Sequence, residues 1–62
     1  MSRIEVLLME AWEMGIKDQV IERVIQKQKE LTFKDKWMSR EDIYEEAMTE
    51  VKKEIFDNGS RN

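Results

Sequence analysis

Residues 2–31 read SRIEVLLMEAWEMGIKDQVIERVIQKQKEL, and this stretch decides the fold. It opens with a capping box, SRIE, in which the Ser2 side chain accepts a hydrogen bond from a first-turn N–H. Apolar residues then recur at helical spacing as far as Gly15. Glycine adopts the left-handed conformation that closes a helix, and Ile16 stands where an apolar residue folds back onto the last turn. The pattern predicts a helix over residues 2–14.

A second helix is predicted over residues 18–31, with Asp18 suited to its N-terminal end. The connection between the two helices is only about three residues long, which makes them antiparallel neighbours. Residues 1–31 therefore form an αα-hairpin, or helical hook, with an apolar stripe on each helix. Gln28 is the one polar member of the stripes. The stripe residues are the candidate partner-binding residues: Ile4, Leu7, Leu8, Ala11, Trp12, Ile16, Ile21, Val24, Ile25 and Gln28.

The remainder of the chain is predicted to hold one more helix. Residues 32–38 read as a linker or a frayed last turn, with Phe33 and Trp37 packed on the hairpin. The sequence SRED at 39–42 resembles a capping box and begins a third helix over about residues 39–56, within a segment 39–57. A turn signal, DNGS at 57–60, ends it and leaves a frayed tail over 58–62. The apolar positions of this helix repeat every four residues: Ile43, Ala47, Val51 and Ile55.

The composition supports an all-α chain and excludes several functions. Charged and apolar residues each make up 40%, and proline is absent. There is no cysteine and no histidine, so disulfides and the usual zinc or haem sites are impossible. Catalysis and cofactors are not expected, because 62 residues leave little chain to wall a pocket. With no long apolar segment and no signal peptide, we expect a cytoplasmic protein that does not enter membranes.

A chain of 62 residues has a marginal core, so its apolar stripes need further cover. Two hairpins could pair two-fold into a four-helix bundle that buries both stripes. The third helix could instead close a three-helix core within one chain. Both packings use the same apolar surface. A protein partner, as a homodimer or a heterodimer, is expected because so small a chain cannot keep both stripes from water alone; a three-helix core within one chain would remove that need.

The charge pattern argues against direct nucleic-acid binding. The net charge is −3, and basic residues beside the aromatic ones are flanked by acidic ones. Acidic residues gather at the start of the third helix, where they suit the helix dipole. This cluster reads as a solvated face, with phosphate mimicry towards a basic DNA-binding surface as the alternative. Its members are Glu41, Asp42, Glu45, Glu46 and Glu50.

Residues 4–28 resemble the helical hook of the Sin-type anti-repressors and of their repressors' oligomerisation segment, from Bacillus-like bacteria. The resemblance rests on Leu7, Leu8, Glu10, Ala11, Gly15, Ile16, Ile21, Val24 and Ile25. Two positions depart from the family: Ile4 stands where it has tryptophan, and Trp12 where it has a smaller or polar residue. The resemblance implies two-fold pairing of hooks, in which an anti-repressor hook replaces a repressor subunit and the repressor releases DNA.

The hypothesis that follows is a small regulatory protein of the anti-repressor kind, which binds a transcriptional regulator through its hook. Two alternatives use the same apolar stripes. One is an inhibitor or adaptor of another regulator, such as a sensor kinase. The other is a phage or mobile-element protein that neutralises a host factor.

Overall fold

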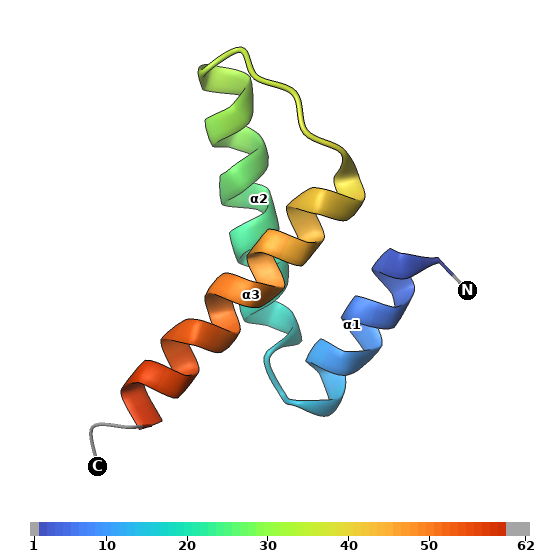
Figure 1. Ribbon diagram of the computed structural model, residues 1–62, viewed down its shortest axis with the longest axis vertical. Helices are drawn as coiled ribbons and strands as arrows, with labels where there is room; N and C mark the ends of the chain where they lie inside the picture. The colour runs from blue at the N-terminus through green and yellow to red at the C-terminus, as the bar shows by residue number, and fades with distance from the viewer. Residues whose placement is uncertain (1, 60–62) are drawn as a thin grey trace.

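The computed structural model describes residues 2–59 of the chain, and that part is entirely helical outside its connections. Helix α1 spans Arg3–Glu13, α2 spans Lys17–Phe33 and α3 spans Arg40–Gly59. The predicted all-α fold, a hairpin followed by a third helix, is confirmed. Figure 1 shows α1 and α2 diverging from their short connection, with α3 crossing the hairpin.

The helix starts follow the capping signals in the sequence. Ser2 has extended backbone angles, and its hydroxyl accepts from the backbone N–H of Glu5 at 3.2 Å. Ser39 does the same for the N–H of Asp42 at 3.2 Å, which opens α3. Helix α2 starts without a side-chain cap at Ile16, and Asp18 lies inside its first turn instead. There the carboxylate complements the helix dipole.

The end of α1 is the turn that the sequence predicts. Gly15 has φ +74°, the left-handed region in which a Cβ would be strained. The N–H of Ile16 donates to the Ala11 carbonyl at 2.9 Å, and the N–H of Gly15 donates to the Trp12 carbonyl at 3.0 Å. These two bonds define a Schellman motif. Its apolar contact is also present, because Ile16 is buried.

Helix α2 ends in the same motif, two residues later than predicted. Asp35 takes the glycine position with φ 54°. The N–H of Lys36 donates to the Leu31 carbonyl at 2.9 Å, and the N–H of Asp35 donates to that of Thr32 at 3.2 Å. Aspartate tolerates this conformation because its short polar side chain bonds locally.

Helix α3 also runs further than predicted, through Gly59. The DNGS signal therefore does not stop the helix at residue 57, because the helical hydrogen bonds continue through its first three residues. Residues 60–62 of the predicted tail lie outside the described residues.

Helix α3 supplies the cover that the hairpin needs. Of the two packings that the sequence leaves open, the three-helix core within one chain is the one present. Leu7, Leu31, Met38 and Tyr44 pack against this core while half-buried. At about 1.5–3 kcal/mol for each large aliphatic side chain, this burial outweighs any surface ion pair. The buried residues are Ala11, Ile16, Val20, Val24, Ile43, Ala47, Met48 and Val51.

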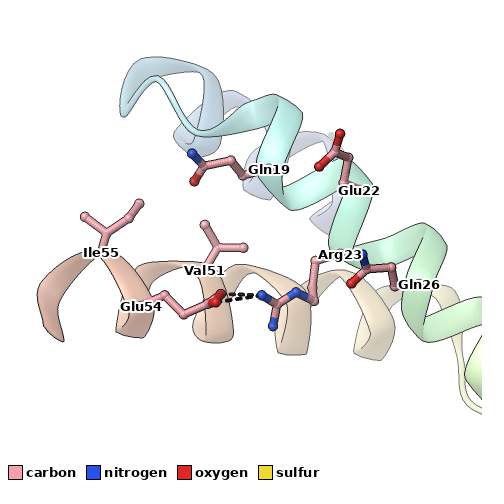
Figure 2. A pocket seen from close by; sticks show the side chains of 7 residues that line it. All are labelled: Gln19, Glu22, Arg23, Gln26, Val51, Glu54 and Ile55. Atoms are coloured by element: carbon pink, nitrogen blue, oxygen red, sulfur yellow. Dashed lines mark hydrogen bonds and ion pairs between the residues drawn. The ribbon is translucent and has the colours of Figure 1, made fainter. Parts of the chain in front are cut away.

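Ion pairs fasten α3 to both helices of the hairpin. Arg3 and Glu10 of α1 pair with Glu45 and Lys52 of α3. From α2, Arg23 donates to Glu50 at 2.8 Å and to Glu54 Oε2 at 2.8 Å, and Figure 2 shows the second of these bonds. Lys27 pairs with Glu50 and lies 3.8 Å from Glu46. Much of the acidic cluster predicted as a solvated face is therefore paired within the chain.

Candidate interaction surface

The structure divides the ten predicted partner-binding residues between two faces of the hairpin. The inner four take part in the core with α3; three of them are buried and Leu7 packs against the buried group. The outer six are half-buried or exposed. The inner residues are Leu7, Ala11, Ile16 and Val24, and the outer residues are Ile4, Leu8, Trp12, Ile21, Ile25 and Gln28.

The outer residues form one row on each helix of the hairpin. Ile4, Leu8 and Trp12 follow each other at intervals of four residues along α1, so they share a face of that helix. On α2, Ile21 and Ile25 lie at the same interval, and Gln28 continues the row. We call these the α1 row and the α2 row.

The α1 row borders a shallow apolar hollow at the closed end of the hairpin. Leu8, Met9 and Trp12 line it, together with Lys17 at the start of α2. The Trp12 side chain is 70% exposed and Met9 is 50% exposed. Tryptophan and methionine are enriched in protein interfaces, where each supplies a large adaptable contact area. The α1 hollow is thus apolar surface that α3 leaves uncovered.

A second hollow follows the α2 row. Ile25 is 45% exposed, and Phe33 at the end of the helix is 89% exposed. The Thr32 hydroxyl donates to the Gln28 backbone carbonyl at 2.9 Å, so its polar group is satisfied within the helix. Ile25 and Phe33 supply the apolar part of the lining, and Gln28 and Lys29 add polar groups. Ile25, Gln28, Lys29, Thr32 and Phe33 line this α2 hollow.

A third hollow, between α2 and α3, is polar and holds the ion pair drawn in Figure 2. Its guanidinium, from Arg23, is already bound by Glu50 and Glu54. These bonds raise the pKa of Arg23, chiefly through the hydrogen bond to Glu50. Its other lining residues are amides, Glu22 and two aliphatic side chains. Within residues 2–59, there is no group of three or more acidic side chains arranged to hold a metal ion.

The ion pairs of α3 predict a loss of stability in acid. Hydrogen bonds from Lys27 and then Arg23 hold the pKa of Glu50 below its ordinary 4.5. A depressed folded-state pKa stabilises the fold above pH 4.5, and this contribution disappears as pH falls through the folded value. Glu50→Gln is therefore expected to lower the free energy of unfolding by up to about 1 kcal/mol at neutral pH. The variant should also lose less of that free energy than the wild type as the pH falls into the acid range, here called the acid limb. Urea unfolding at several pH values measures both effects.

A matched control is Glu46→Gln, which removes a neighbouring carboxylate that lies 3.8 Å from Lys27 and is 52% exposed. Its effect on the acid limb should be smaller than that of Glu50→Gln. Equal effects would contradict the assignment to Glu50.

Several surface residues were missed or misplaced by the sequence reasoning. Met9 was not among the predicted partner-binding residues, but it lines the α1 hollow. Phe33 and Trp37 were expected to pack on the hairpin, which is wrong: they are 89% and 87% exposed. Periodicity identifies residues that share a face, but Phe33 ends a helix and Trp37 lies in a connection, where no period applies.

A comparison with protein-family models finds no match, and comparisons with curated proteins and with solved structures find none either. None of the helices within residues 2–59 has the length and apolar character required to cross a bilayer. The α1 and α2 rows and their hollows are the features of the described residues that bear on function.

Proposed function

We propose that this chain is a small regulatory protein that binds an apolar helical segment of another protein through the α1 row. The observation that carries the proposal is the α1 hollow, in which Trp12 is 70% exposed beside Leu8 and Met9. A side chain of this size in water is an anchor of the kind that dominates binding energy in interfaces. An amphipathic helix is the partner that suits a shallow apolar hollow on a helix pair.

The proposed partner is a transcriptional repressor, and the proposed action is that of an anti-repressor. The resemblance of residues 4–28 to the Sin-type hook supports this choice. Binding of the chain to the repressor's oligomerisation helices would occupy the surface through which repressor subunits pair. A repressor that loses its second subunit loses half of its DNA contacts and releases its operator.

Helix α3 limits how the hook can be used. Because Ala11, Ile16 and Val24 are buried under α3, a partner that binds the folded chain meets the outer rows alone. The proposal therefore assigns binding to Leu8, Met9 and Trp12, with Ile25 of the α2 row as a flanking contact. It differs in this respect from the two-fold pairing of bare hooks that the resemblance implies.

The test is release of a Sin-type repressor from operator DNA, followed by gel shift as the chain is added. The wild-type chain is expected to release the repressor at near-stoichiometric amounts. Trp12→Ala should raise the amount needed at least about tenfold, because it removes the central anchor. Its exposure means that the fold tolerates the change.

Phe56→Ala is the matched control, because Phe56 is 68% exposed, lies on α3 and belongs to neither row. It should leave repressor release unchanged. No release at a large excess of chain, or equal loss with Trp12→Ala and Phe56→Ala, would refute the proposal. If the chain inhibits autophosphorylation of a sensor kinase and does not release the repressor, it is a kinase inhibitor and not an anti-repressor.

A further inference from the structure

The two most exposed large apolar side chains among the described residues both belong to the junction of α2 and α3. Phe33 is the last residue of α2 and is 89% exposed, and Trp37, in the connection, is 87% exposed. The connection begins with the Schellman motif at Asp35, whose last bonded residue, Lys36, directly precedes Trp37. Figure 1 shows this connection at the open end of the hairpin, opposite the turn that bears the α1 hollow.

Charges of both signs lie within five residues after or one residue before Trp37, at Lys36, Arg40, Glu41 and Asp42. Within the described range, no ion pair involves Lys36 before it, or Glu41 and Asp42 after it. By contrast, Glu45, Glu46, Glu50 and Glu54 further along the same helix are paired with the hairpin. Residues 36–42 thus form a junction patch with one tryptophan, two cations (Lys36 and Arg40) and two carboxylates, and none of these four charges is in an ion pair within the described residues.

We propose that the junction patch is a homodimer interface, occupied by the same patch of a second copy related by a two-fold axis. A two-fold contact needs a surface that complements itself. The junction patch meets this requirement, since Lys36 of each copy would face Asp42 of the other while the two Trp37 side chains cover each other. A polyanion such as nucleic acid would meet Glu41 and Asp42 beside the cations Lys36 and Arg40, whereas a second copy offers an opposite charge to both signs.

A hollow beside the patch suits this arrangement. It is lined by Met38, Asp42, Glu45, Glu46, Thr49 and Glu50. Three of its four carboxylates are paired with Arg3, Arg23 or Lys27, so Asp42 is the charge left for an incoming cation. The Lys36 side chain of a second copy would lay its aliphatic stem on Met38 and its ammonium on Asp42.

The homodimer would make the proposed regulator bivalent, because the α1 hollows lie at the other end of each hairpin. The inference does not rest on the proposed function, and the two fail separately. Trp37→Ala is expected to abolish self-association and spare binding of one partner helix, whereas Trp12→Ala is expected to do the reverse.

The test is sedimentation equilibrium of the full chain over a concentration series at low salt. The wild-type chain is expected to reach twice its 7.5 kDa mass in the high-micromolar range. Trp37→Ala should raise the dimer dissociation constant at least about tenfold. In a Trp12→Phe background, where Trp37 is the sole tryptophan, its emission should shift to the red on dilution.

A charge swap separates this two-fold contact from other associations. Lys36→Glu and Asp42→Lys should each weaken the dimer about tenfold, since each change creates two repulsive contacts. The double variant should return to within about threefold of wild type, because it restores the pairs with reversed signs. Lys53→Glu, an exposed α3 residue with the same change of charge, is the control and should have little effect.

A monomer throughout the concentration series would overturn the proposal. A dimer that Trp37→Ala and Lys36→Glu leave intact would overturn it as well, because the contact would then lie elsewhere. A shift of Trp37 emission on addition of a single-stranded oligonucleotide to the monomer would assign the patch to a polyanion instead.

Discussion

Val20→Asp is expected to leave the chain unfolded at room temperature. Val20 is fully buried at 0% exposure, and Ala11, Ile16 and Val24 belong to the same core. An uncompensated buried charge costs at least about 3–5 kcal/mol, and the lost aliphatic contacts add to this. A domain of this size lies near the lower end of the usual stability of about 5–15 kcal/mol. Far-ultraviolet circular dichroism and urea unfolding measure the loss.

Gln19→Asp is the control for this variant, because it adds the same side chain to the preceding, exposed position of α2. That variant should retain its helical signal, since a carboxylate in the first turn of a helix suits the dipole. A cooperative unfolding transition in Val20→Asp with a midpoint near that of wild type would show that this core does not hold the helices together.

A chain cut after Phe33 is the second change with a large expected effect. It keeps the whole hairpin but loses α3, which covers Ala11, Ile16, Val20 and Val24. Isolated helices of fewer than about 12–15 residues are marginal in water. Helix α1, with 11 residues, is shorter than this, and α2, with 17 residues, is only slightly longer. At micromolar concentration the truncated chain should lose most of its helical circular dichroism signal.

The same truncation tests the other packing that the sequence allowed. If the bare hairpin pairs two-fold into a four-helix bundle, its helical signal will recover as concentration rises, and its mass will double. Full helicity of the truncated chain as a monomer would contradict the role assigned to α3. Addition of a peptide that spans residues 34–62 should restore helicity to an unfolded truncated chain.

The parts of the fold that local chemistry decides were predictable from sequence. Ser2, Gly15 and Ser39 each mark a helix boundary, because each does there what few other residues do: cap an N–H or adopt a positive φ. The end of α2 was harder, since Asp35 occupies a position where glycine is the usual signal. The end of α3 was placed too early because the DNGS sequence suits a turn but does not forbid a helix.

What covers the hairpin could not be predicted, because a second hook and α3 would bury the same stripe. The free energies of the two packings differ by contributions that depend on how well the side chains fit in three dimensions. One example is the packing around the small core side chains Ala11 and Ala47. The same ambiguity affected the prediction of the ten partner-binding residues. Six of its ten residues are the outer rows, and Trp12 among them is well exposed, but the inner four belong to the core or its edge.

The core of this protein contains no aromatic ring among the described residues. It consists of alanine, valine, isoleucine and methionine, while both tryptophans and both phenylalanines are largely in water and Tyr44 is half-buried at the edge. Indole emission and near-ultraviolet dichroism consequently say little about whether the molecule is folded. Once the other tryptophan is replaced by phenylalanine, the emission of the remaining one therefore reports binding at its own end of the molecule rather than folding.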